Sequence, residues 1–308
     1  MLRTLKDSPY VGMVDQNTKY IATGIETLDN AFNSLVSGTV TIITGRPASG
    51  KSTLVHSIIL NAIDKRHKTL LFDGEYERNQ LLNTLFRQVI GNDETLYKKI
   101  RCNLKVRYEP KPQVQKMLNK WFDDILITFS KHETDLTDLK TIFELTLNTC
   151  KALDVDVVVY DNLMSLISSS QAEQNAEQTN FMKMCTSLAK AANVAVILVT
   201  HPNGTALKGK ELDFYQISGT TNLPNLADNI IHVIKDPTDD NEEVISDGRI
   251  NVLKNRYYGE YPKIDLAYDK TTMSLCEIYG GGYKVGAYNW RMNGRQQTQW
   301  IEKEVKPI

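Results

Sequence analysis

The sequence lacks long hydrophobic segments. Its first residues, "MLRTLKDSPYVG", contain no apolar core of the kind found in secretory signals. No apolar run approaches the roughly 20 residues that a membrane-spanning helix needs. Cysteine is scarce as well, with 4 in 308 residues, and none lie close enough in sequence for a zinc or redox pair. We therefore expect a cytoplasmic protein with free thiols and no membrane partner.

An excess of basic residues is also absent. Lys and Arg number 36 and Asp and Glu number 37, so the formal net charge is −1. Nucleic-acid-binding proteins are often basic overall, so the average charge gives no support for that function, although it is compatible with a local basic channel. With 41% apolar and 24% charged residues, the composition is that of a globular protein, and 308 residues are enough for one large α/β domain or two small ones.

What the sequence does have is a glycine-rich motif. "TGRPASGKST" follows the apolar run "TVTII" and precedes "LVHSIILNAI", which predicts a strand, a tight loop and a helix. Loop N–H groups at a helix N-terminus form an anion site, and Gly45 and Gly50 let the backbone approach a ligand closely. The residues that we expect to cradle a nucleotide are Gly45, Arg46, Pro47, Ala48, Ser49, Gly50, Lys51, Ser52 and Thr53.

Two side chains of this motif carry chemistry. Lys51 can reach the β- and γ-phosphates of a nucleoside triphosphate, and the Ser52 hydroxyl can hold Mg²⁺. The alternative is a chance glycine-rich turn, but the predicted strand before it and helix after it are the context that the motif requires. The sequence thus predicts a nucleoside triphosphate site that uses Mg²⁺.

The rest of the chain predicts alternating strands and helices. We expect strands at 39–44, 68–73, 124–130, 155–161, 193–200, 229–234, 249–255 and 263–269, the last of these being the final strand. We expect helices at 51–65, 76–90 and 137–153, and one between the strands 155–161 and 193–200. This alternation indicates an α/β fold with a mostly parallel sheet. Residues 93–122 carry many charges and show no clear period.

Polar side chains follow several of these strands. Ligands of such sheets bind at the carboxyl ends of the strands, so we expect Asp161 and His201 to converge on the glycine-rich loop. Asp161 can hold Mg²⁺ opposite Ser52, or else it caps the turn that follows. His201 can contact the γ-phosphate, although a lone histidine is more often structural.

Three acidic residues are candidates for the base that activates the attacking water. Asp73 ends the strand 68–73, and Glu75 and Glu77 follow it. A carboxylate at this place can orient and deprotonate water. We favour Glu75; the alternative is a solvated acid in the first turn of a helix, where the helix dipole favours negative charge.

Two cations stand close together in "LKNRYYGEY". Lys254 and Arg256 lie on the same face of a predicted strand, because side chains alternate along a strand. Arginine stabilises charge on a transferring phosphoryl group when it is presented in cis or in trans. The alternative is a pair of solvated strand charges.

In order and spacing, these segments resemble the RecA-like motor domain of the superfamily 4 hexameric replicative helicases. The likeness is greatest to the bacteriophage primase-helicases and the mitochondrial Twinkle helicase, and it runs from about Gly24 to about Thr272. The segments that carry it are "TGRPASGKST", "LLFDGEYERNQLL", "VVVYDNLMSLI", "VILVTHP", "QISGTTNLPNLADNIIHV" and "VLKNRYYGE".

The resemblance implies a RecA-like P-loop NTPase core, with a twisted, mostly parallel sheet and helices on both faces. It implies that Glu75 is the catalytic base, Asp161 the Walker B acid and His201 the γ-phosphate sensor. It implies that Arg256 is an arginine finger and Lys254 its companion, both acting on the nucleotide of the neighbouring subunit. Tyr268 matches an aromatic residue that stacks on the base.

The resemblance also implies partners. Such motors enclose single-stranded DNA in a homo-oligomeric, typically hexameric ring, travel 5′→3′ using ATP or dTTP, and work with a primase or polymerase of the replisome. The expected DNA-binding loops are 168–178 and 202–222, which are otherwise plain connectors. The residues of the second loop that we expect to bind DNA are Lys208, Lys210, Gly219 and Thr220.

Two departures from the family limit the resemblance. We expect no primase or zinc-binding region before Gly24, so residues 1–20 would have to supply the linker helix that closes the ring, and the tail 279–308 is not acidic like some phage tails. We expect an arm at 1–22, the motor at 23–275 and an extension at 276–308 that docks on a neighbour or a partner. The rivals are a RecA-type recombinase or mediator that forms filaments, and a helicase loader that uses ATP as a switch.

Overall fold

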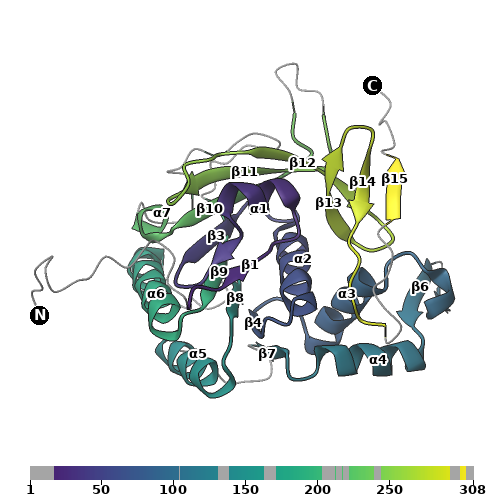
Figure 1. The fold of residues 1–308 in the computed structure, drawn as a ribbon, viewed down its shortest axis with the longest axis horizontal. Helices are drawn as coiled ribbons and strands as arrows, with labels where there is room; N and C mark the ends of the chain where they lie inside the picture. The colour runs from purple at the N-terminus through teal and green to yellow at the C-terminus, as the bar shows by residue number, and fades with distance from the viewer. Residues whose placement is uncertain are drawn as a thin grey trace, which may run out of the picture.

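A mixed sheet of 11 strands runs through the molecule (Figure 1). The computed structural model describes residues 17–103, 105–130, 139–162, 171–202, 212, 217, 222–238, 244–291 and 299–302. The strand order in the sheet is β15-β14-β13-β12-β11-β10-β3-β9-β8-β4-β7. The strands are β3 (Val40–Thr44), β4 (Thr69–Asp73), β7 (Leu126–Ser130), β8 (Val157–Asp161), β9 (Ala195–Thr200), β10 (Asn229–Lys235), β11 (Gly248–Asn255), β12 (Lys263–Asp269), β13 (Ser274–Tyr279), β14 (Gly282–Val285) and β15 (Gln299–Glu302).

Helices cover both faces of this sheet. They are α1 (Glu26–Phe32), α2 (Lys51–Asp64), α3 (Arg78–Ile90), α4 (Pro112–Phe122), α5 (Leu139–Leu153), α6 (Gln171–Ala192) and α7 (Asn222–Leu226). In Figure 1, α5 and α6 lie on one face of the parallel strands, and α1, α2 and α3 lie on the other. Two small two-stranded sheets complete the described part, formed by β1 (Tyr20–Ile21) with β2 (Leu35–Val36) and by β5 (Tyr97–Cys102) with β6 (Lys105–Pro110).

The sheet divides into a parallel part and an antiparallel part. Strands β10, β3, β9, β8, β4 and β7 are parallel to their neighbours, whereas β11 to β15 pair antiparallel. This arrangement confirms the α/β fold with a mostly parallel sheet. Because the parallel strands end at the same edge, the residues that follow them come together there.

The apolar runs of the central strands are explained by burial on both faces. In β3 and β4 every residue is buried. Ile43 and Leu71 belong to the core that includes α2 and α3, whereas Ile42 and Leu70 belong to the core that includes α5 and α6. Side chains alternate along a strand, so a strand that is covered on both faces needs apolar residues at every position.

The prediction that 263–269 is the final strand was wrong. Strand β12 has those bounds, but β13, β14 and β15 follow it and extend the antiparallel part of the sheet. Residues 93–122, which had no clear period, form the β5–β6 hairpin and α4. Hairpin strands with charged residues on a solvated side carry only a weak hydrophobic pattern.

The described part of the C-terminal extension packs on this chain itself. Tyr288 and Trp290 are each 5% exposed and belong to the core that includes α2 and α4. The Arg291 guanidinium pairs with the Asp93 carboxylate at 3.0 Å, and the Asn289 N–H donates to the Asp64 carboxylate at 2.5 Å. Up to residue 291 this segment thus packs on its own chain, and docking of the extension on a neighbour or a partner stays a prediction.

This packing predicts a large loss of stability when Trp290 is truncated. We expect Trp290→Ala to lower the free energy of unfolding by about 3–5 kcal/mol, because the side chain leaves a cavity in the core. Trp300→Ala is the matched control, since Trp300 is 48% exposed, and we expect it to cost under about 1 kcal/mol. Urea unfolding of both variants measures the difference. Equal, small losses would show that the extension does not pack as described.

Candidate nucleotide site

The glycine-rich loop joins β3 to α2. Gly50 caps the N-terminus of α2 with a φ of 96°, a left-handed conformation that favours glycine. A Cβ on Gly45 would overlap the Val233 carbonyl oxygen of β10, so a side chain there would displace the neighbouring strand. The loop conformation therefore depends on both glycines, one for its dihedral angle and one for close strand packing.

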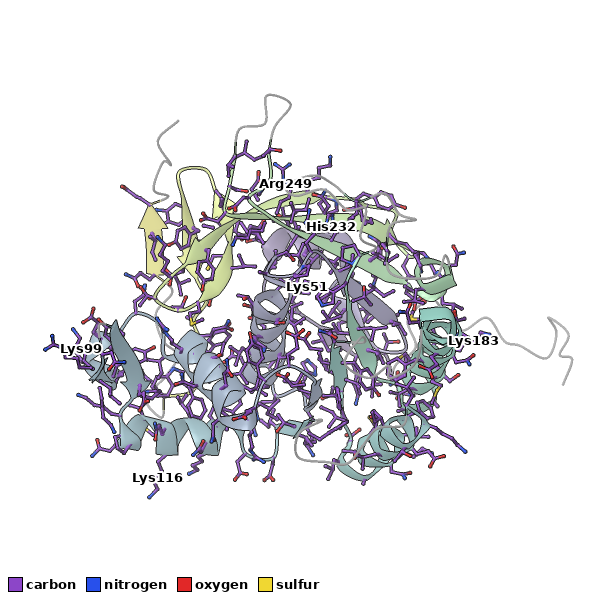
Figure 2. The ribbon with its side chains drawn as sticks, turned by 180° about the vertical axis from the view of Figure 1, so that it is seen from behind. Lys51, Lys99, Lys116, Lys183, His232 and Arg249 are labelled. Atoms are coloured by element: carbon purple, nitrogen blue, oxygen red, sulfur yellow. The ribbon has the colours of Figure 1, made fainter. Side chains whose placement is uncertain are left out.

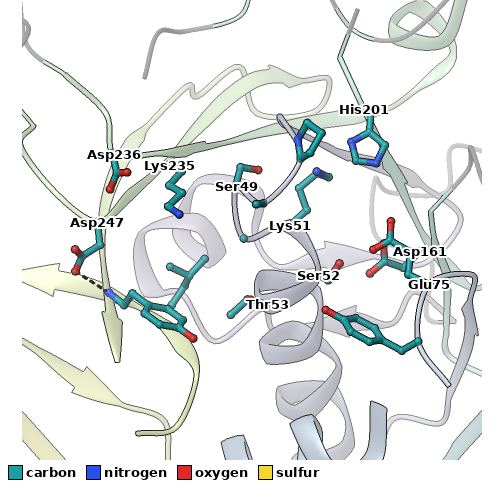
Figure 3. A pocket seen from close by; sticks show the side chains of 16 residues that line it. Ser49, Lys51, Ser52, Thr53, Glu75, Asp161, His201, Lys235, Asp236 and Asp247 are labelled. Atoms are coloured by element: carbon teal, nitrogen blue, oxygen red, sulfur yellow. Dashed lines mark hydrogen bonds between the residues drawn. The ribbon is translucent and has the colours of Figure 1, made fainter. Parts of the chain in front are cut away.

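A cavity of about 640 Å³ opens beside this loop (Figure 3). Its lining comes from the loop, from the ends of the central strands and from the antiparallel part of the sheet. The lining residues are Pro47, Ala48, Ser49, Gly50, Lys51, Ser52, Thr53, Glu75, Tyr76, Asp161, His201, Lys235, Asp236, Asp247, Tyr268 and Leu275. The predicted residues from Pro47 to Thr53, together with Glu75, Asp161, His201 and Tyr268, thus meet in one place.

Lys51 is the buried cation of the cavity. Its ammonium group donates to the carbonyl oxygens of Gly45 and Arg46, both at 2.9 Å, and the residue is 6% exposed. Figure 2 shows it at the centre of the molecule, whereas Lys99, Lys116 and Lys183 lie at the periphery. Burial lowers the pKa of Lys51 to about 8, against the attraction of Asp161 and Glu75.

Asp161 is the buried acid of the cavity. Burial, helped by the nearby Asp73 and Glu75, raises its pKa to about 7, against a hydrogen bond from Ser52 and the charge of Lys51, which lower it. A buried carboxylate beside a serine hydroxyl offers hard oxygen ligands, which Mg²⁺ prefers. In the part of the chain that the structure describes, no three His, Cys, Asp and Glu side chains form a metal site. The cation would therefore need phosphate oxygens and water as further ligands.

The three candidate bases differ in position. Asp73 accepts hydrogen bonds from the N–H groups of Glu75 and Tyr76, at 2.9 and 2.8 Å, and so shapes the turn after β4. Glu75 lines the cavity, while Glu77 immediately precedes α3, at its N-cap position, and does not line the cavity. Of the three acids, only Glu75 is thus placed to meet water at a bound phosphate.

Asn162 connects Glu75 with His201. Its side-chain amide donates to the Glu75 carboxylate and lies 3.4 Å from Nε2 of His201. Burial and the charge of Lys51 lower the pKa of His201, which favours the neutral imidazole. A neutral histidine can accept or donate a hydrogen bond at the γ-phosphate without adding charge.

Lys254 and Arg256 lie outside the cavity. The Arg256 guanidinium pairs with the Asp228 carboxylate at 2.9 Å and donates to the Asn225 carbonyl at 2.9 Å. The Lys254 ammonium donates to the Pro224 carbonyl at 2.8 Å. Burial and the nearby Arg256 lower the pKa of Lys254. Both cations therefore donate hydrogen bonds to carbonyl groups of α7. The alternative, a pair of strand charges that contact only solvent, does not describe them.

Comparison with known families identifies the family of this chain. The family model of the DnaB-like helicase C-terminal domain matches residues 20–277, which is well over half of the 308 residues. The chain belongs to this family. It is the motor domain of a replicative helicase, and the resemblance to superfamily 4 helicases is confirmed. The match does not favour the recombinase and loader alternatives.

Solved structures agree with the fold of this helicase domain. One chain, described as an ATPase domain, is 15% identical with a TM-score of 0.67, over 84% of this chain and 91% of that one. "The Structure Of A DnaB-Like Replicative Helicase And Its Interactions With Primase" is 15% identical with a TM-score of 0.66, over 85% of this chain and 64% of that one. The "Probable iron export ATP-binding protein FetA" of Escherichia coli (strain K12) is 27% identical over 197 residues, 60% of this chain and 83% of that protein.

Sequence reasoning missed one end of the helicase cavity. Figure 3 shows Lys235, Asp236 and Asp247 across the cavity from Asp161 and Glu75. The rule that ligands meet the carboxyl ends of parallel strands applies equally to β10, which ends at Lys235, and would have found the first two. Asp247 precedes β11 in an antiparallel pair, and no sequence signal marks it.

Some predicted residues cannot be placed in this helicase domain. Lys208, Lys210, Gly219 and Thr220 lie outside the described residues, as does most of the loop 202–222. Of the loop 168–178, the backbone from Gln171 onward belongs to α6. Among the residues that the structure covers, no helix is long and apolar enough to cross a membrane.

The buried Asp161 predicts a pH-dependent stability. Its folded pKa of about 7 exceeds the ordinary value of 3.8, so between these values the folded protein keeps a proton that the unfolded chain releases. Stability therefore falls as the pH rises through this window and then levels off. Asp161→Asn removes the effect. We expect this substitution to raise the free energy of unfolding of the nucleotide-free protein, and to raise it more at pH 8 than at pH 5. The difference between the two gains should be about 3 kcal/mol at most. Equal effects at both pH values in urea unfolding would contradict this.

Proposed function

We propose that this helicase domain hydrolyses ATP or dTTP with Mg²⁺, translocates on single-stranded DNA as a hexameric ring, and unwinds duplex DNA during replication. The observation that carries the proposal is an incomplete site. The residues expected to hold phosphates, bind Mg²⁺ and activate water line one cavity, but the expected arginine finger does not. Among the described residues, no arginine lines that cavity.

The hairpin of β10 and β11 explains why Arg256 cannot serve its own cavity. Lys235 lines the cavity and pairs with Gly248, whereas Asn229 pairs with Asn255 at the opposite end. Strand β10 has 7 residues, which corresponds to about 23 Å at roughly 3.3 Å per residue. Arg256 follows Asn255, so it lies a full strand length from the nucleotide. A neighbouring copy would bring its Arg256 to this cavity.

The surface next to Arg256 fits such a contact. Tyr257, Tyr258 and Tyr261 are all exposed in the turn that joins β11 to β12. Tyrosine is enriched at protein interfaces, because its ring provides apolar contact area and its hydroxyl group a hydrogen bond. This turn would therefore contact the copy that receives the arginine.

We propose the following roles within one site. Lys51 holds the β- and γ-phosphates, and Ser52 and Asp161 hold Mg²⁺, which when bound neutralises phosphate charge. Glu75 takes a proton from the attacking water. The companion cation Lys254 and the finger act from the next copy.

Two further roles couple the nucleotide to its surroundings. His201 senses the γ-phosphate and relays its state to the adjoining loop 202–222, whose Lys208, Lys210, Gly219 and Thr220 would bind DNA phosphates. At the other end of the cavity, Tyr268 stacks on the base.

The setting of this activity is also a proposal. A related structure is described with its interactions with primase, and a primase or polymerase is a fitting partner here. We propose the cytoplasm of a bacterium or of a phage-infected host as the location. We keep the proposed division into an arm at 1–22, a motor at 23–275 and an extension at 276–308. Strand β13 crosses the boundary between the motor and the extension.

The assignment of the base predicts a clean loss of hydrolysis. Glu75→Gln keeps the shape of the side chain but cannot accept the proton of water, so we expect kcat to fall by about 10²–10⁴-fold. Nucleotide affinity should stay within about threefold, since Lys51 and the loop are intact. Glu77→Gln is the control, because Glu77 lies two positions further on and does not line the cavity. If both variants lost the same activity, Glu75 would not be the base.

The motor function is tested by strand displacement on a forked DNA with single-stranded tails. We expect displacement that requires ATP and a 5′ tail, and its loss in Arg256→Ala together with a fall in hydrolysis of about 10³-fold or more. Arg249→Ala is the matched control, since Arg249 lies on the same strand β11, pairs with Asp265 of β12 and should be dispensable. Hydrolysis and DNA binding without displacement by the wild type would count against a helicase motor.

A further inference from the structure

Asp228 holds the arginine that the proposed function assigns to the neighbouring site. It lies between α7 and β10, and Oδ1 of its carboxylate accepts a hydrogen bond from Nη1 of Arg256 at 2.9 Å. The Asp228 carbonyl also accepts the Arg256 main-chain N–H at 3.1 Å. A third bond runs from Nη2 of Arg256 to the Asn225 carbonyl at 2.9 Å. Backbone and guanidinium of Arg256 are thus fixed by the same few residues.

The Asp228 carboxylate is itself held rigidly. Its second oxygen, Oδ2, accepts the Val40 N–H at 3.0 Å, and the Asp228 N–H donates to the Val40 carbonyl at 2.9 Å. Val40 begins β3, the strand that leads into the glycine-rich loop. Asp228 is 7% exposed. Because both oxygens have partners on fixed backbone or on Arg256, the carboxylate has one available orientation.

Arg256 keeps donors for a further ligand. Its guanidinium group has five N–H donors, and its bonds to Asp228 and Asn225 use one on each terminal nitrogen. The side chain is 46% exposed, although its partner carboxylate is buried. An arginine that is anchored on one side and open on the other loses little side-chain entropy when it meets a phosphate.

We propose that Asp228 is a positioning residue, which orients Arg256 of one copy toward the nucleotide of the next. The inference rests on the proposed function, because it needs Arg256 to act in trans. A positioning role and a purely structural role of Asp228 predict effects at different nucleotide sites. Asp228 contacts β3 of its own copy, so a bracing role would affect its own nucleotide site, whereas a positioning role affects the site of its neighbour.

Mixed assemblies separate these two roles. Asp228→Asn keeps an acceptor for Val40 but loses the charge that holds Arg256. We expect DNA-stimulated hydrolysis by this variant to fall by about 10- to 100-fold at unchanged nucleotide affinity. Lys51→Ala lacks a working nucleotide site but presents a well-held Arg256. When the two variants are mixed before ATP is added, a copy with Asp228→Asn can receive the finger of a copy with Lys51→Ala. The rate should then rise clearly above the mean of the two variants alone.

Controls make the result decisive. Asp265→Asn removes an aspartate–arginine pair of the same 2.9 Å length, between β12 and β11, and we expect it to hydrolyse ATP like the wild type. Asp228→Ser serves as a second variant if the first folds poorly, since its hydroxyl can still accept the Val40 N–H. Thermal unfolding and binding of a fluorescent nucleotide check both.

The outcomes distinguish the inference from the function on which it rests. If Arg256→Ala recovers when mixed with Lys51→Ala but Asp228→Asn does not, the trans finger stands and the positioning role is wrong. A wild-type rate for Asp228→Asn alone would also overturn the positioning role. A wild-type rate for Arg256→Ala alone would overturn the proposed function and the inference with it.

Discussion

The parallel register of the central strands is the constraint on which the site depends. Thr44 pairs with Thr200, and Asp73 pairs with Asp161, so β3, β9, β4 and β8 all end at the same level of the sheet. Each strand then delivers its next residues to one edge, although these residues lie far apart in the sequence. A shift of one residue in any of these strands would turn its buried side chains to the opposite layer, and two complete cores oppose that shift.

The charges at this edge are poorly accommodated by the protein alone. Burial moves Lys51 toward its neutral form, with a pKa of about 8, and moves Asp161 toward its neutral form, with a pKa of about 7. Both groups are desolvated, and this costs stability. Phosphates and a divalent cation are complementary to these two groups. The same burial that destabilises the protein therefore prepares the cavity for nucleotide.

The β10–β11 hairpin links the two halves of the proposed catalytic unit while keeping them apart. One end of the hairpin, at Lys235, lines the cavity, and the other end carries Arg256, which is braced by Asp228. The two ends are joined by one antiparallel pair, whose register shifts once, between Ile230 and Ile231. In a ring, each copy would thus combine its own nucleotide with control of the next site.

The sequence alone determined the fold class, most strand positions and the glycine-rich loop, because these depend on local patterns: apolar runs, strand-end residues and a motif with its own backbone chemistry. It favoured Glu75 among three acids for the role of base, and the tertiary structure showed that the Glu75 side chain lines the cavity. Tertiary structure alone placed Trp290 in the core and Lys235 at the cavity. It also showed Arg256 bound to Asp228. These contacts join residues that are distant in sequence, and neither composition nor periodicity records which distant surfaces will meet.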